Sequence, residues 1–308
     1  MANGIHLAQV KQGAKHWNDW REANIGTVLD LSDANLIGVN LSGASLVGVN
    51  LSGAYLSGAY LSRADLQEAN LAKANLADAD FTGANFTAAY LSDANLTGAN
   101  LSGADLPGAN LFAANFQQAN LRGANLREAR LFEANLTAAE LVDVDLTRAN
   151  LCRANLGQAN LTRADLSRAY LIHANLIEAN LNEAELLETN LTEADLSRAN
   201  LSEANCSGAN LRRVNLGEAY LVGATLNGAD FTGASFEGAN LTGVKALSAN
   251  FRAAKFTGAC LEDWRINRDT QLDGILCDYL FLQSHQRQRR PFEGVFAPGG
   301  FIQVMGLK

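Results

Sequence analysis

The sequence predicts a solenoid, in which short extended segments wind into coils around a narrow core of Leu and Ala. Two observations lead to this prediction. A Leu or Phe recurs every five residues from Leu31 to Leu261 without an insertion, and only Cys206 and Ala246 depart from this rule. Ala fills most positions two residues earlier, with Asn or Asp usually in between. A repeat this short and this regular is typical of solenoid proteins.

A period of five excludes the two common regular elements as the main structure. Five residues of α-helix advance by about 500°, which would spread the Leu side chains around the whole cylinder. In a flat strand an odd spacing would place successive Leu side chains on opposite faces. Ala and the Leu two residues later do share one face of an extended segment. The two residues that follow can then turn the chain before the next pair points inward.

The repeating unit is clearest in the stretch Leu91-Ser-Asp-Ala-Asn-Leu96. It resembles the A(D/N)LXX unit of the pentapeptide-repeat family, and the resemblance covers about three quarters of the chain. It implies an all-β solenoid, a right-handed quadrilateral β-helix with four units in each coil. The repeat domain is expected over residues 25–261.

The first segment, residues 1–24, has a different pattern. Its apolar residues follow helical spacing, at Leu7, Val10, Ala14 and Trp17. This pattern predicts one amphipathic helix over 5–24. Solenoids need atypical terminal units to cover their open apolar ends, so the helix is expected to act as an N-terminal cap.

The last segment, residues 262–308, loses the repeat. Trp264, Asp269 and Gly274 stand where Ala would be expected. We predict degenerate coils followed by an irregular C-terminal tail. The stretches 261–267 and 296–301 are similar to tails that follow the repeats in cyanobacterial members of the family.

Composition excludes several classes of function. The chain has 32 acidic and 24 basic residues and a net charge of −8, which argues against a generally basic surface that binds nucleic acid directly. No apolar run is long enough to span a membrane. No export signal is visible at the N-terminus, so a cytoplasmic location is expected. The four Cys form no CxxC pair and predict neither a zinc site nor a disulfide framework.

No catalytic motif is present. None of the four His lies in HExxH, and the chain contains no GxSxG, Walker A or GxGxxG sequence. Carboxylates are plentiful, but on outward positions of a coil they lack the pocket that acid–base catalysis needs. We therefore expect a protein that is not an enzyme and has no cofactor or metal.

One outward row of side chains is apolar. If four units form a coil, residues 20 apart stack on the same side. One such row contains four successive apolar residues, with Tyr170 beside it: Phe112, Phe132, Cys152 and Ile172. An exposed apolar stripe is typical of a docking site for another protein, here an unidentified partner. In the alternative interpretation these side chains merely cover the backbone at a corner.

A second outward row is acidic. It runs along the Asn/Asp position, and further acidic residues lie beside its later members. The acidic residues are Asp105, Asp143, Asp145, Asp165, Glu183, Glu185 and Glu203. In family members that inhibit DNA gyrase an acidic face imitates duplex DNA, so the resemblance implies DNA mimicry as an alternative function. The simpler interpretation is a solvated face whose Asn and Asp side chains satisfy turns.

The leading hypothesis is a non-enzymatic scaffold for protein–protein interactions that presents rigid β-helix faces to its partner. The alternative is a DNA-mimicking regulator of DNA gyrase or of another DNA-binding protein. The oligomeric state is left open. Opposite charges 20 residues apart are expected to pair across neighbouring coils, for example Glu133 with Arg153 and Glu178 with Arg198.

Overall fold

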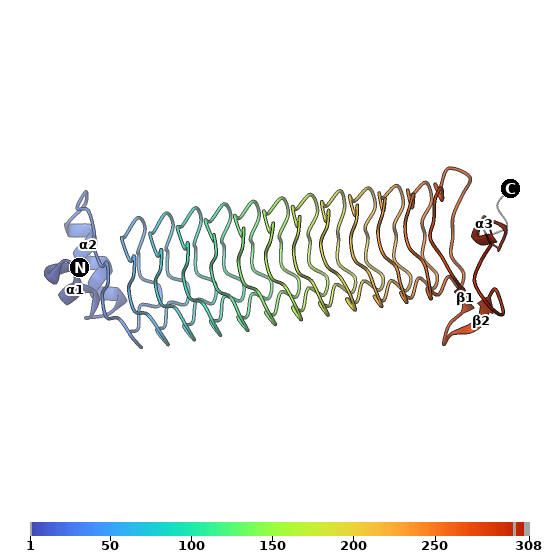
Figure 1. The fold of residues 1–308 in the computed structure, drawn as a ribbon. Helices are drawn as coiled ribbons and strands as arrows, with labels where there is room; N and C mark the ends of the chain where they lie inside the picture. The colour runs from blue at the N-terminus through green and yellow to red at the C-terminus, as the bar shows by residue number, and fades with distance from the viewer. Residues whose placement is uncertain (1, 298–299, 305–308) are drawn as a thin grey trace. The chain divides into compact units, whose positions relative to one another are not determined.

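The computed structural model describes residues 2–297 and 300–304. It divides into two compact units, Met1–Asn155 and Leu156–Lys308, and coils of extended chain make up most of each unit (Figure 1). Helices α1 (Gly4–Val10) and α2 (Ala14–Ala23) precede the coils of the first unit. Strands β1 (Leu280–Gln283) and β2 (Arg287–Arg290) and helix α3 (Gly300–Val304) follow the coils of the second unit.

The coils are four-sided. Parallel bridges join residues 20 apart and recur every five residues within each unit, from Asp30↔Asn50 to Asn135↔Asn155 in the first and from Asn160↔Asn180 to Lys245↔Arg265 in the second. Each bridge residue is the outward Asn, Asp or equivalent that lies between the buried Ala and Leu. Four such positions complete one coil, so residues 20 apart form a row on one side and residues ten apart lie on opposite walls.

The corners explain why the period is five. Two turn residues follow each central Leu, and the second of them adopts a left-handed backbone, with φ +58 at Asp93 and +67 at Gly98. The turn closes when the next Ala donates to the central carbonyl, as Ala94 N does to Leu91 O at 3.1 Å. This turn redirects the chain to the next wall, and the Leu after it points inward again.

The core of each unit consists of the central Leu and Phe side chains and the Ala side chains. Nearly all of them are fully buried. Burial of one Leu or Phe contributes about 1.5–3 kcal/mol. The backbone is satisfied between coils, since Leu91 N donates to Asn110 O at 2.7 Å and Asn95 N donates to Ala74 O at 2.9 Å.

The N-terminal segment contains two helices, where the sequence pattern predicted one helix over 5–24. Helix α1 ends at Val10 and α2 begins at Ala14. Gly13 lies between them with φ +93, a conformation that an α-helix does not contain. The apolar spacing continues across the break, which is why the pattern concealed it.

Side chains of α2 bind the open edge of the first coil. The backbone N–H of Ser45 donates to Asn18 Oδ1 at 2.8 Å. The Ser45 carbonyl accepts from Trp17 Nε1 and Arg21 Nη1, each at 2.7 Å, and Arg21 Nη2 donates to Val47 O at 2.6 Å. An earlier coil would supply backbone groups at these places, so the side chains of α2 stand in for that coil.

The coil pattern extends past Leu261 with one extra residue. The bridge Lys245↔Arg265 spans 20 residues, and the next one, Asn250↔Gln271, spans 21. The chain then forms an antiparallel hairpin of β1 and β2, in which Leu280 pairs with Arg290. The predicted irregular tail therefore contains a hairpin and the short helix α3.

Aromatic side chains fill the C-terminal end of the core. Trp264, at a former Ala position, packs against Phe251 and Phe256 with ring centroids 5.3 and 5.7 Å apart. The ring centroid of Phe301, in α3, lies 5.7 Å from that of Phe256. These rings cover the last coil, as α2 covers the first.

Candidate protein-binding surface

Two of the predicted docking residues form an aromatic stack on the first unit. The rings of Phe112 and Phe132 are nearly parallel, with centroids 6.0 Å apart and planes inclined by 7°. The bridge Asn110↔Arg130 sets this arrangement, because it places the two first-turn positions on the same corner of neighbouring coils. Phe112 is 41% exposed and Phe132 is half-buried.

Basic side chains flank the stack. The guanidinium carbon of Arg153 lies 5.7 Å from the centroid of the Phe132 ring, and Arg153 Nη1 lies 3.5 Å from Glu133 Oε1. Arg130 is exposed on the strand that leads into Phe132. The 20-residue spacing predicted the Glu133–Arg153 pair, whereas the position of Arg153 over Phe132 was not predicted. Arg153 follows Phe132 by 21 residues, one coil plus one residue, and this spacing was the sequence signal that could have predicted the contact.

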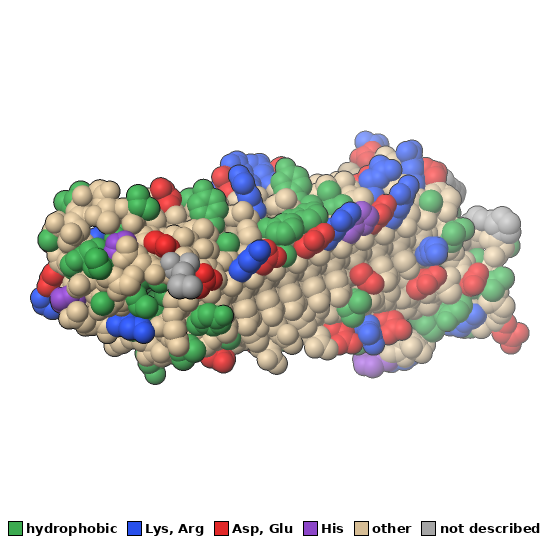
Figure 2. Space-filling view, turned by 60° about the vertical axis from the view of Figure 1, so that its left-hand side comes forward, with side chains coloured by type: hydrophobic (Ala, Val, Ile, Leu, Met, Phe, Trp, Pro, Cys, Tyr) green, Lys and Arg blue, Asp and Glu red, His purple; other side chains and the backbone are tan. Residues whose placement is uncertain are grey.

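The other members of the predicted stripe are divided between the units. Cys152 is half-buried, and its carbonyl accepts from Glu133 N at 3.1 Å in the first unit. Ile172, half-buried, and Tyr170, 51% exposed, belong to the second unit. Figure 2 shows exposed hydrophobic side chains with charged side chains beside them. The contact that the structure provides is the Phe112–Phe132 stack.

The acidic residues of the first unit lie among hydrogen-bond donors. Asp105 Oδ1 accepts from Asn125 Nδ2 at 3.2 Å. Asp145 Oδ2 lies 3.3 Å from Arg127 Nη1 in an ion pair. Asp143 is exposed on a turn. In this unit the predicted row therefore alternates carboxylates with amides.

In the second unit most of the predicted acidic residues also have partners. Asp165 Oδ1 accepts from Ser167 N, and Glu185 Oε2 accepts from Asn205 Nδ2, both at 2.9 Å. Glu183 Oε1 accepts from Asn182 Nδ2 at 3.1 Å. Glu203 is exposed on a turn. These carboxylates therefore accept hydrogen bonds from their own turns or from a neighbouring coil.

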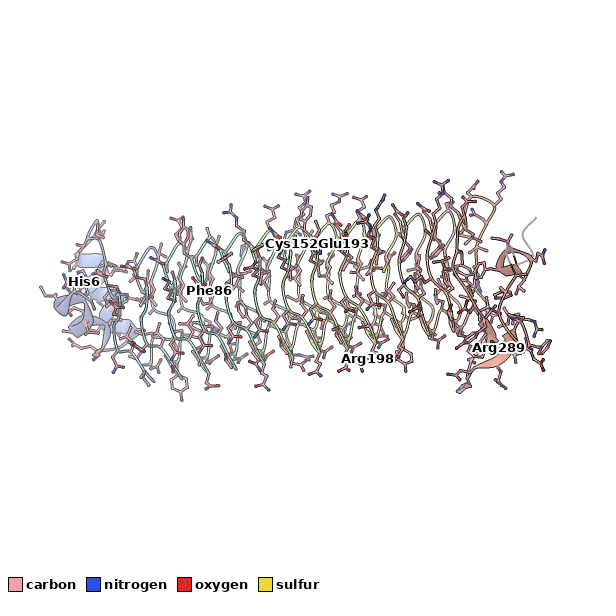
Figure 3. All side chains as sticks on the ribbon, in the orientation of Figure 1. His6, Phe86, Cys152, Glu193, Arg198 and Arg289 are labelled. Atoms are coloured by element: carbon pink, nitrogen blue, oxygen red, sulfur yellow. The ribbon has the colours of Figure 1, made fainter. Side chains whose placement is uncertain are left out.

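Opposite charges pair along the corners, as the 20-residue spacing predicted. Four of the pairs, with N···O distances of 2.9–3.5 Å, are Glu128–Arg148, Glu133–Arg153, Glu178–Arg198 and Glu193–Arg213. Glu193 and Arg198 are labelled in Figure 3. All these pairs are well exposed, so each contributes about 0–1 kcal/mol.

Two of the four thiols, those of Cys206 and Cys277, are held in the protonated form. Burial raises the pKa of Cys206 to about 12, and burial likewise raises the pKa of Cys277 to about 12. Both therefore remain protonated at neutral pH, whereas the thiolate is the nucleophile and metal ligand. Within residues 2–297 and 300–304, no group of three His, Cys, Asp or Glu is arranged to hold a metal ion. Over the same residues, no helix has the length and apolarity to cross a membrane.

The four-sided coils and their outward rows define a β-helix solenoid. The family model described as "Pentapeptide repeats" matches eight segments, some of which overlap, and together they cover residues 30–127 and 129–263. The chain belongs to the pentapeptide repeat family, and its β-helix is right-handed. The family assignment made from the A(D/N)LXX unit is thereby confirmed. No curated protein matches the chain.

Solved structures of the same kind are similar to this chain. HetL, a pentapeptide repeat protein involved in heterocyst differentiation regulation in the cyanobacterium Nostoc sp. strain PCC 7120, is 30% identical over 87% of this chain and 98% of its own, with a TM-score of 0.32. Rfr23 from the cyanobacterium Cyanothece 51142 is 35% identical over 40% of this chain and 64% of its own, with a TM-score of 0.17. QnrB1, a plasmid-mediated fluoroquinolone resistance protein, is 19% identical over 73% of this chain and 89% of its own, with a TM-score of 0.23.

Proposed function

We propose that this protein is a non-enzymatic scaffold that binds another protein through the Phe112–Phe132 stack. The observation that carries the proposal is the pair of parallel rings on an outward corner. Aromatic side chains contribute large contact areas in protein interfaces, and exposed apolar groups in contact with each other are a common feature of docking sites.

The flanking charges define the chemistry of the partner. Arg153 lies over one ring while it also pairs with Glu133, and Arg130 is exposed two residues before Phe132. A partner that packs an apolar side chain against the rings would gain from a carboxylate close to these guanidinium groups. We therefore expect a partner surface with an apolar anchor beside an Asp or Glu.

The test uses Phe132→Asp. Proteins that bind the wild-type chain are identified first, and each purified partner is then titrated against the wild-type chain and the variant. Loss of a central aromatic anchor costs at least about 2 kcal/mol, so the dissociation constant should rise by about 30-fold or more. Gln117→Asp introduces the same charge at the same turn position of another corner and should leave binding unchanged. An unchanged isotherm for folded Phe132→Asp would contradict the proposal.

The alternative, a DNA-mimicking regulator, has less support because amides interrupt the acidic row. A supercoiling assay with DNA gyrase tests it directly. Inhibition by the wild-type chain that disappears in the triple variant Asp145→Asn, Asp165→Asn, Glu185→Gln would favour this function over the scaffold. Absence of inhibition by the wild-type chain would argue against it.

A further inference from the structure

One row of outward side chains in the second unit changes from acidic to basic along its length. Consecutive members are joined by parallel bridges, so each lies directly across from the next. In order, the row is Asp165, Glu185, Asn205, Thr225, Lys245 and Arg265. We call it the graded row. Its members occupy the middle of one wall of the coil, between two corners.

The graded row places like charges next to each other at both ends. Asp165 is bridged to Glu185, and Lys245 is bridged to Arg265. Like charges directly opposite each other on neighbouring strands are destabilising. On the corners of the same unit the chain does the reverse, since Glu178 pairs with Arg198 at 3.1 Å.

The basic end of the row is left without counter-charges. Glu185, Lys245 and Arg265 are exposed, and Asp165 is half-buried. Among the residues that the structure describes, neither Lys245 nor Arg265 forms an ion pair with a carboxylate. Within residues 2–297 and 300–304, the donors to the acidic end are neutral, Ser167 N on Asp165 and Asn205 Nδ2 on Glu185. Charged side chains at both ends of the row are therefore available to form ion pairs with another molecule.

The order of charges is self-complementary under two-fold symmetry. The rotation axis lies in the plane of the wall, crosses the row at right angles and passes between Asn205 and Thr225. It brings Glu185 of one copy opposite Lys245 of a second copy, and Asp165 opposite Arg265. Both copies have the same spacing of about 4.8 Å between strands, so the match holds along the whole row.

Two exposed Leu residues follow the same symmetry. Leu187 and Leu247 occupy first-turn positions on the adjacent corner and are 38% and 42% exposed. They lie at the same levels as Glu185 and Lys245. The rotation therefore places Leu187 of one copy beside Leu247 of the other. Each contact would bury apolar surface next to an ion pair, a combination typical of an interface rim with an apolar centre.

We propose that this wall binds a second copy of the same chain in antiparallel orientation and forms a two-fold symmetric dimer. In such an interface the same patch on both subunits is complementary to itself. The order of charges selects the antiparallel orientation. A parallel copy in register would place Asp165 opposite Asp165 and Arg265 opposite Arg265, so like charges would repel. This surface is distinct from the Phe112–Phe132 stack, so the two proposals stand or fall separately.

The experiment measures the dimer dissociation constant by sedimentation equilibrium at low ionic strength. Variant one carries Asp165→Lys and Glu185→Lys, which makes the row wholly basic. Variant two carries Lys245→Glu and Arg265→Glu, which makes it wholly acidic. The wild-type chain should dimerise, and each variant alone should dimerise about 100-fold more weakly because like charges now face each other. An equimolar mixture of the two variants should form a heterodimer with affinity close to that of the wild type.

Lys255→Glu is the matched control, since Lys255 is exposed on the opposite wall and this variant should dimerise as the wild type does. Far-ultraviolet circular dichroism and the unfolding midpoint establish that every variant is folded. A wild-type chain that stays monomeric overturns the proposal, as do variants that dimerise normally. Failure of the folded variants to associate when mixed also overturns it.

Discussion

At the second turn position the backbone is left-handed whichever residue occupies it. Ala88 has φ +54, and Gly108, one coil further along the same row, has φ +66. A residue with a Cβ pays about 1–2 kcal/mol in this conformation, whereas Gly does not. Turn residues such as Ala88 therefore carry local strain that the regular coil imposes.

We expect Ala88→Gly to stabilise the protein. The relief of strain exceeds the greater chain entropy of Gly in the unfolded state, which leaves a net gain of about 0.5–1 kcal/mol. The free energy of unfolding in urea measures this gain. Gly108→Ala is the reciprocal change, and an added Cβ there meets no atom within 4 Å. It should destabilise by a similar amount, and equal stabilities for all three proteins would contradict the strain argument.

The outward Asn side chains form ladders that join one coil to the next. Asn95 Nδ2 donates to Asn75 Oδ1 at 3.2 Å, while Asn95 Oδ1 accepts from Thr97 N at the same distance. One amide thus supports its own turn and the coil before it. A carboxylate can supply only the first of these contacts.

Asn95→Asp should therefore destabilise the fold at neutral pH. The new carboxylate oxygen faces Asn75 Oδ1 where a donor stood, and loss of such a hydrogen bond costs about 1–2 kcal/mol. Denaturant unfolding measures the change. Asn110→Asp is the control, because Asn110 Oδ1 accepts from Phe112 N and its amide nitrogen has no acceptor among the described residues. If both variants lost the same stability, the ladder would not be the cause.

The hairpin of β1 and β2 is attached to the last coil through a carboxylate. Glu262 Oε2 accepts from the backbone N–H of Ser284 at 2.9 Å. This hydrogen bond, with smaller contributions from Arg287 and His285, lowers the pKa of Glu262 below its usual range. The attachment is therefore present above pH about 4.3 and is lost as the pH falls through the depressed pKa of the folded state.

The amide proton resonance of Ser284 should report this titration. Its chemical shift is expected to change with a midpoint below pH about 4.3, because protonated Glu262 is a weaker acceptor. Glu262→Gln should abolish the transition. A midpoint at or above the ordinary Glu value would contradict the assigned contact. The guanidinium carbon of Arg289, a residue of β2 labelled in Figure 3, lies 4.3 Å from the centroid of the Tyr279 ring. This contact should not change when Glu262 is protonated.

Across the molecule, the five-residue period predicted most of what the coils contain. It identified the inward Leu and Phe, the Ala beside them and, once four units formed a coil, the proximity of Phe112 to Phe132. It could not predict the extra residue between Arg265 and Gln271, because the pattern had already lost its Ala positions there. The hairpin turn was also hidden. His285 and Gln286 adopt φ +58 and +55 without the Asn-Gly sequence that signals such turns.

The small side chain of Ala246 in the core is explained by the residues on the opposite wall of the coil. Ala246 is fully buried where a Leu would be expected. The wall ten residues away holds Phe236 and Phe256, whose rings stack with centroids 4.8 Å apart. We infer that the small side chain compensates for these large rings across a lumen of fixed width.

Ala246→Leu should therefore destabilise by about 1–3 kcal/mol through overpacking. Cys206→Leu is the matched control on the same wall. Leu196 and Leu216 lie on the wall opposite Cys206, so an added Leu there restores the usual pair and should change stability by less than about 1 kcal/mol. Thermal unfolding compares the two. An Ala246→Leu protein at least as stable as the wild type would show that the site had empty space.

The interior of each coil repeats every five residues, but its surface repeats every twenty. A genetic deletion of five residues would keep every later Leu inside while rotating each later side chain onto the neighbouring wall. A deletion of twenty would remove one layer and leave all rows aligned. Length changes in multiples of five can thus redesign the exterior of this protein in a single event while its interior stays filled.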